Sequence, residues 1–190
     1  MIPHPAPPSK STVDDATLVF QIGNGDLEAL GILFDRHEDA VARFLSRMGV
    51  SPADIDDLVQ NTFLQVLRAV RRFDPRVSVR SWLLGIASMM ARRHRRSLGR
   101  LTKRIRSWAT IPRGPGITPD EALAERQAEL RLGRALDALS DKKREAFVLV
   151  TLEGMSGEEA AVALGVPVNT VWTRLHHARR ELRALVGVEP

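Results

Sequence analysis

Apolar residues recur every three or four positions through most of the chain, which is the spacing of amphipathic helices. Four segments of the first half carry this pattern and are predicted to be helices: 14–22, 26–48, 52–70 and 81–97. Ser51 and Pro52 suit the N-cap and first turn of the third helix, and Gly49 suits the end of the second. Since no segment alternates convincingly as a half-buried strand would, we predict an all-α fold.

The second half begins with a capping box, in which a hydroxyl residue is followed by glutamate three positions later. Thr118 is the predicted N-cap and Glu121 its partner, and Ser140 is predicted to cap a further helix over 141–152. The inward positions of the helix that Thr118 opens are Leu123, Leu130, Leu136 and Leu139.

A second capping box, Ser156 with Glu159, starts a short helix over 156–164. Gly165 permits a tight turn, and a final amphipathic helix is predicted over 168–185. A short helix, a tight turn and a longer helix together make a helix-turn-helix.

Proline and glycine cluster in two places, residues 3–8 and 112–119, and neither segment can be helical. We therefore expect two small helical domains joined by a flexible linker. The expected boundaries are a disordered leader over 1–13, a first domain over 14–97, a linker over 98–119 and a second domain over 120–187.

Charge is distributed unevenly along the 190 residues, although the formal net charge is only +5. Residues 71–113 hold thirteen basic residues and one acidic residue, a net charge of +12, whereas 24–70 and 114–159 are each net −4. The basic block is the expected nucleic-acid contact. A solvated helix face or a disordered basic linker would give the same composition.

The final helix carries the chemistry of a major-groove reader on the face opposite its apolar stripe. Asparagine, threonine and histidine hydrogen-bond base edges, and arginine holds phosphates or guanine. The candidate DNA-binding residues are Asn169, Thr170, Trp172, Thr173, Arg174, His176, His177, Arg179 and Arg180. The alternative is a solvent-exposed helix in a purely structural hairpin.

Several functional classes are disfavoured by the sequence. The chain has no cysteine, which excludes disulfides and thiolate metal sites and fits a reducing cytosol. The glycine-containing segment 23–31 lacks the lysine and the preceding strand of a phosphate loop. His176 and His177 point about 100° apart on a helix, which is poor metal geometry. We expect no enzyme activity, no cofactor, no metal and no insertion into a membrane.

These segments resemble the extracytoplasmic-function group of bacterial sigma factors. Residues 33–45, 55–75 and 79–96 resemble the family's first domain, and 135–182 are similar to its minus-35-binding domain almost end to end. The resemblance covers roughly 14–97 and 120–186. It implies a cytoplasmic protein that binds core RNA polymerase, recognises minus-35 and minus-ten promoter elements and nucleates promoter melting.

The resemblance also assigns residues to the polymerase. The helix 52–70 would dock on the coiled coil of the largest polymerase subunit, and the second domain would contact the flap. The implied contact residues are Asp56, Asp57, Gln60, Asn61 and Gln65. The family most often has glutamate where this chain has Asn61.

The loop 74–80 corresponds to the family's element that captures a base flipped from the minus-ten strand. Trp82 either stacks at the fork of melted DNA or belongs to the core, and the arginines that follow suit phosphates. The implied minus-ten residues are Asp74, Arg76, Ser78, Arg80, Trp82, Arg92, Arg93, Arg95 and Arg96.

Besides Asn61, two features depart from the family's pattern. Trp172 stands where a basic or small polar residue is common, and the linker is basic over 100–106. A dedicated anti-sigma factor is a further partner that the resemblance implies. Two functions other than a sigma factor remain as alternatives: a stand-alone transcription regulator and a degenerate sigma-like adaptor.

Overall fold

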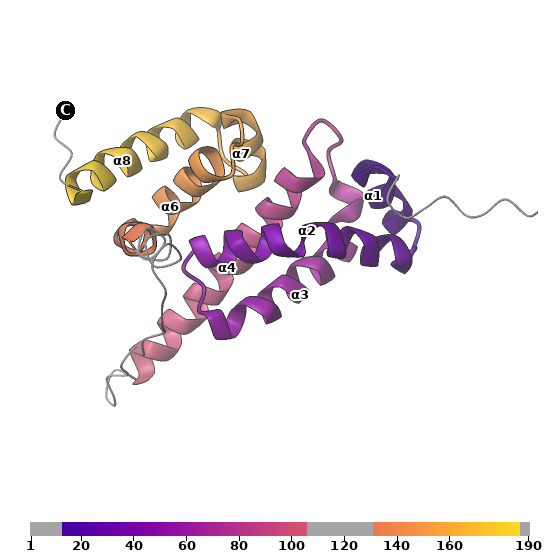
Figure 1. Cartoon of the computed structure of the whole chain (residues 1–190), viewed down its shortest axis with the longest axis horizontal. Coiled ribbons are helices and arrows are strands. Elements are labelled where there is room, and N and C mark those ends of the chain that lie inside the picture. Colours follow the sequence, from indigo (N-terminus) through magenta and orange to yellow (C-terminus); the bar gives the residue numbers. More distant parts are fainter. Residues whose placement is uncertain (1–12, 106–130, 187–190) are drawn as a thin grey trace, which may run out of the picture.

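The computed structural model describes residues 13–105 and 131–186, with side chains over 13–97 and 131–185 (Figure 1). Every regular element in these ranges is helical, which confirms the all-α prediction for this part of the chain. No described helix is both long enough and apolar enough to cross a membrane.

The N-terminal half contains α1 (Asp15–Gly23), α2 (Leu27–Arg47), α3 (Pro52–Ala69), a 3-10 turn η1 (Val70–Arg72) and α4 (Val79–Ile105). The predicted cap of α3 is confirmed, because the Ser51 hydroxyl accepts from the Ala53 amide. Gly49 follows α2 with φ +77°, a conformation that glycine adopts without steric cost.

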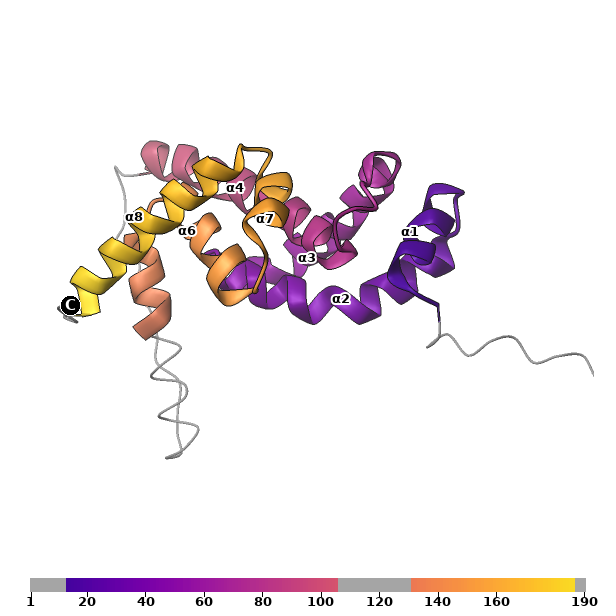
Figure 2. The ribbon, with the colours of Figure 1, turned by 90° about the horizontal axis from the view of Figure 1, so that it is seen from above.

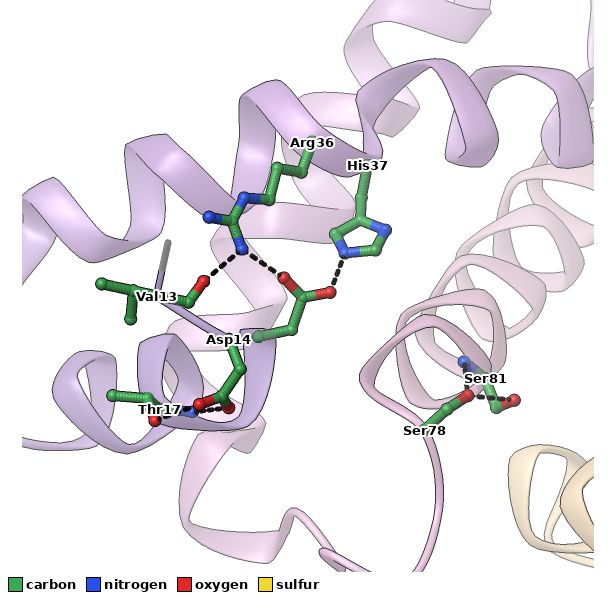
Figure 3. A network of polar contacts seen from close by, with 8 residues as sticks. Val13, Asp14, Thr17, Arg36, His37, Ser78 and Ser81 are labelled. Carbon is green, nitrogen blue, oxygen red and sulfur yellow. Dashed lines mark hydrogen bonds and ion pairs between the residues drawn. The ribbon is translucent and has the colours of Figure 1, made fainter. Parts of the chain in front are cut away.

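A polar network fastens α1 to α2. Arg36 donates to the Val13 carbonyl at 2.7 Å and to Asp15 at 2.8 Å, and His37 donates to Asp15 at 2.6 Å (Figure 3). Asp14 caps α1 by accepting from the amide and hydroxyl of Thr17. Charge-assisted hydrogen bonds therefore hold a helix too short to be stable alone.

The helix predicted over 81–97 differs from α4 at both ends. It begins at Val79 and continues to Ile105, so it enters the segment expected to be a linker from residue 98. Leu98, Leu101 and Ile105 continue the three- and four-residue apolar spacing of a helix into this stretch. The basic residues between them are good helix formers, so the helix that is already nucleated extends. The remaining expected linker, the leader over 1–12, the Thr118 capping box and Leu123 and Leu130 lie outside the described residues.

The C-terminal half contains a helical segment over 131–138, then α6 (Asp141–Phe147), η2 (Val148–Leu152), α7 (Gly157–Leu164) and α8 (Val168–Val186). The capping box of Ser156 and Glu159 is confirmed with both reciprocal hydrogen bonds. Gly165 has φ +63° at the turn before α8. The predicted helix 141–152 differs from the structure in two respects. Its second half is π-helical, and Ser140 at its N-cap makes no capping hydrogen bond through its side chain.

The two halves pack against each other. The helix α7 lies on α4, and the two views show the C-terminal helices beside α2 and α4, with α1 at the far end from the end of α8 (Figures 1 and 2). Gly85 permits the contact, because a Cβ there would lie 3.0 Å from the Cα and carbonyl oxygen of Ala163. The described chain therefore adopts a closed arrangement of its two helical units.

Candidate nucleic-acid interface

The outer face of α3 presents most of the side chains expected to contact a protein partner. Asp56, Asp57, Gln60 and Asn61 are exposed, and Gln65 is partly buried. Sequence reasoning missed Leu64 and Leu67 on the same face, which are 57% and 37% exposed. The available signal was spacing: Leu64 follows Gln60 by four residues, and Leu67 follows Leu64 by three, so they share a helix face.

The loop before α4 is held by its own ion pair. Arg76 donates to Asp74 through its backbone amide at 3.0 Å and through its guanidinium at 2.6 Å. These hydrogen bonds lower the pKa of Asp74 to about 2. The guanidinium of Arg76 is 88% exposed and remains accessible from solvent.

Ser78 is occupied as the cap of α4. Its hydroxyl accepts from the Ser81 amide at 3.1 Å and donates to the Ser81 hydroxyl at 2.7 Å (Figure 3). The Ser81 hydroxyl in turn donates to Glu159 of α7 at 3.1 Å. Ser78 therefore fixes where α4 begins and the direction in which the loop 74–78 enters the helix.

Three arginines of the expected minus-ten set instead face carboxylates of the C-terminal half. Arg80 pairs with Glu153, Arg92 with Glu145 at 3.2 Å and Arg95 with Asp141 at 2.9 Å. Arg93 and Arg96 are exposed. The structure thus brings part of the predicted minus-ten surface into the contact between the two halves.

Trp82 packs against the core, which agrees with one of its two alternatives, whereas stacking on melted DNA stays a prediction. Its ring packs at 5.0 Å from that of Phe73, and it is partly buried against the core. It also lines a cavity of about 350 Å³ between the halves, together with Met89, Val162 and Glu159. The indole therefore has one packed face and one face toward open space.

The predicted reading face of α8 is mostly accessible. Asn169, Trp172, Thr173, His176, Arg179 and Arg180 are exposed, whereas Thr170, Arg174 and His177 are partly buried. The Thr173 hydroxyl donates to the Asn169 carbonyl at 2.8 Å, so its methyl group is freer than its hydroxyl. The described residues contain no group of three or more metal-ligating side chains close enough to hold an ion.

Trp172 has a structural contact that the sequence did not reveal. It is 46% exposed, and the rest of its indole lies over the first turn of α7. A Cβ on Gly157 would come within 2.3 Å of the indole. Gly157 therefore makes the space in which Trp172 lies, at the junction of the two helices of the helix-turn-helix.

Comparisons with known proteins agree with this geometry. Residues 33–101 match the family model described as sigma-70 region 2, and residues 129–182 match sigma-70, region 4. The RNA polymerase sigma factor CnrH of Cupriavidus metallidurans is 32% identical over 182 residues, covering 92% of this chain and 95% of that protein. The ECF RNA polymerase sigma factor SigE of Mycolicibacterium smegmatis is 32% identical over 184 residues, covering 93% of this chain and 67% of that protein.

A solved structure of CnrH, in complex with the cytosolic domain of CnrY, superposes with a TM-score of 0.67 over 93% of this chain and 99% of that chain. Fold, motifs and relatives define a promoter-specificity protein of bacterial transcription. The chain belongs to the sigma-70 family, in its extracytoplasmic-function group. It serves promoter recognition and transcription initiation by RNA polymerase, which is a regulatory task.

Proposed function

We propose that three surfaces divide the work of this sigma factor. The outer face of α3 binds core polymerase, the loop 74–80 with α4 binds the minus-ten strand, and the exposed face of α8 binds the minus-35 duplex. The observation that carries the proposal is the exposed α3 face, since a stand-alone DNA-binding regulator has no use for it. The proposal involves no catalytic residue, metal or cofactor.

The composition of the α3 face supports a protein partner. It combines carboxylates and amides with two exposed leucines, Leu64 at 57% and Leu67 at 37%, which lie one turn apart on the same helix face. An apolar residue surrounded by acidic and polar side chains fits a partner with a basic rim and an apolar centre. The polymerase coiled coil, with the flap contacting the second domain, is the partner we assign.

The α8 face supports duplex DNA as the other partner. The N-terminal part of a recognition helix usually meets the bases, and here it carries Asn169, Trp172 and Thr173. Asparagine recognises adenine edges, and a threonine methyl contacts thymine. Arg179 and Arg180, further along the helix, are exposed and suit phosphates.

Regulation by a protein inhibitor is a further part of the proposal. The solved CnrH structure contains the cytosolic domain of CnrY, and this chain is 32% identical to CnrH. We assign to this chain an anti-sigma partner that meets it in the cytoplasm, where RNA polymerase is also found. The unit boundaries we propose are 14–97 and 120–187, with α4 extending past the first.

The test replaces one exposed leucine and compares it with another. Leu64→Ser should weaken binding to purified core polymerase at least about tenfold, because it removes an apolar contact from the centre of the interface. Leu27→Ser, on α2 and 66% exposed in the native chain, is the matched control and should bind as the native protein does. Fluorescence polarisation of the labelled proteins measures both. Equal affinities for Leu64→Ser and the native chain would contradict the proposed polymerase face.

A further inference from the structure

Carboxylates of the C-terminal half form a row along the face of α4. Asp141, Glu145 and Glu153, which we call the acidic row, pair with Arg95, Arg92 and Arg80 respectively. Glu153 also accepts from Arg47 of α2 at 2.5 Å, and its backbone carbonyl accepts from Arg80 at 3.0 Å. The row therefore docks two halves of the chain that are far apart in sequence.

Burial shows that the closed arrangement depends most on the pairs of Glu153. The Glu153 side chain is only 4% exposed, and the cationic partners described for it, Arg47 and Arg80, both belong to the N-terminal half. A carboxylate so buried is strongly unfavourable without its partner. Separation of the halves would return Glu153 to water and leave the guanidinium of Arg80 without this partner.

The arginines that the row holds have the arrangement of a phosphate-binding strip. Arg80, Arg92 and Arg95 lie on the same side of α4, within about a third of the helix circumference at 100° per residue. They span fifteen positions, or about 22 Å along the axis. Guanidinium groups bind carboxylates and phosphates through the same planar, charge-assisted hydrogen bonds.

We propose that the acidic row is an intramolecular docking surface that takes the place of promoter phosphates on α4. This inference rests on the proposed function, because it uses α4 as the minus-ten surface. While the halves are closed, three of its arginines are engaged and minus-ten DNA must compete with the chain's own carboxylates. The exposed face of α8 is free in the same state, so duplex binding there does not require opening.

The contact between the halves is built to separate. It is rich in ion pairs, and a cavity of about 350 Å³ lies within it between Trp82, Ile86 and Val162. Polar contacts of this kind are typical of domains that move relative to each other. A cavity also forfeits the dispersion contacts of the side chains that line it.

Two substitutions should open the chain by different means. Glu153→Gln removes the charge that holds Arg80 and Arg47 but keeps the shape of the side chain. Gly85→Leu pushes α7 away, because even a Cβ at this position would lie 3.0 Å from the Ala163 backbone. The substitution should not unfold α4 itself, because leucine favours helix formation more than glycine does. Glu158→Gln, at an exposed position of α7, changes the net charge as Glu153→Gln does and is the matched control.

The probe is a fluorescent oligothymidylate, which offers phosphates without a promoter sequence. Glu153→Gln and Gly85→Leu should each bind it at least about threefold more tightly than the native chain, because the binding-competent fraction rises. Glu158→Gln should show no comparable gain, and binding of a random duplex should not change in any variant. Because the chain has no cysteine, spin labels on cysteines placed at Phe20 and Leu185 report opening independently as a longer distance.

Variants that open but bind oligothymidylate no more tightly would overturn the inference. Equal affinities of Glu153→Gln and Glu158→Gln for oligothymidylate would also overturn it. A failure of the proposed function would look different, because the native protein would then support no promoter-dependent transcription with core polymerase.

Discussion

At the scale of single residues, Trp172 and Gly157 act as a pair. The indole covers the first turn of α7 only because Gly157 has no side chain. The half of Trp172 that remains exposed lies on the predicted DNA-reading face. The departure from the family's usual residue is therefore accommodated by a matching glycine in the preceding helix.

Gly157→Ala should expel the indole from this site. We expect a loss of about 1–3 kcal/mol in unfolding free energy, as in other overpacked sites, and weaker binding of minus-35 duplex. Trp172→Ala in the same chain should relieve most of the added strain. A double-mutant cycle measured by denaturant unfolding checks this, and strictly additive effects would mean that the two residues do not interact.

Asp15 gives a second prediction at this scale. Burial alone would raise its pKa, but hydrogen bonds from Arg36 and His37 outweigh burial, so the pKa is lowered. Because its pKa is lowered, Asp15 stabilises the fold at any pH above about 3.9, the pKa of the carboxyl in the unfolded chain. This stabilisation is lost as the pH falls through the pKa of the folded chain.

Asp15→Asn should therefore reduce stability at neutral pH by about 1–2 kcal/mol, the usual value for hydrogen bonds to a charged group. The difference from the native chain should shrink toward zero below about pH 4. Urea unfolding across pH measures it, with the exposed Asp35→Asn as the control. A difference that persists unchanged in acid would show that the carboxylate charge is not responsible.

At the scale of elements, local signals predicted most helix starts but not all helix ends. Ser51 and Ser156 mark the starts of α3 and α7, because a capping hydroxyl acts on amides two or three residues away. The continuation of α4 through 98–105 was not predicted, because a linker was expected from residue 98, although Leu98, Leu101 and Ile105 keep helical spacing. The π-helical turn η2 was not predicted either, since the sequence indicated only an ordinary helix over 141–152.

Glu145 of α6 leads to a prediction about the element contact. Burial raises the pKa of this carboxyl, and the nearby guanidinium groups of Arg92 and Arg174 offset the rise only in part. Because its pKa is raised, Glu145 favours the folded, closed chain at any pH below about 4.3, the pKa of the carboxyl in the unfolded chain. This contribution is lost as the pH rises through the pKa of the folded chain.

Glu145→Gln should thus be as stable as the native chain in acid, and more stable than the native chain at about pH 8, where the native carboxylate is ionised. The expected gain is about 2–4 °C in melting temperature, the shift that 1 kcal/mol gives in a chain of this size. Thermal unfolding followed by circular dichroism measures it. A native chain more stable than Glu145→Gln at high pH would show that the ion pair with Arg92 outweighs the cost of burial.

At the scale of the whole molecule, the uneven charge of the sequence predicted separate acidic and basic surfaces but not that these surfaces pair with each other. The net charges of +12 over 71–113 and −4 over 114–159 are visible without a structure. The basic block was expected to contact nucleic acid, with a solvated face or a basic linker as the alternative. The pairing of Arg80 with Glu153 was not foreseen, because nothing local links residues so far apart. The family, the helical fold and the reading face of α8 needed only local patterns and the resemblance, whereas the closed arrangement required tertiary structure.

The proposed function requires that the chain act together with core polymerase, and run-off transcription tests this most directly. Purified core would be supplied with the native chain or with Leu64→Ser on a library of promoter fragments. We predict discrete, salt-sensitive start sites that require the native chain and are strongly reduced with Leu64→Ser. A native chain that binds duplex DNA but not core polymerase, or that binds core yet starts no transcript, would contradict the account.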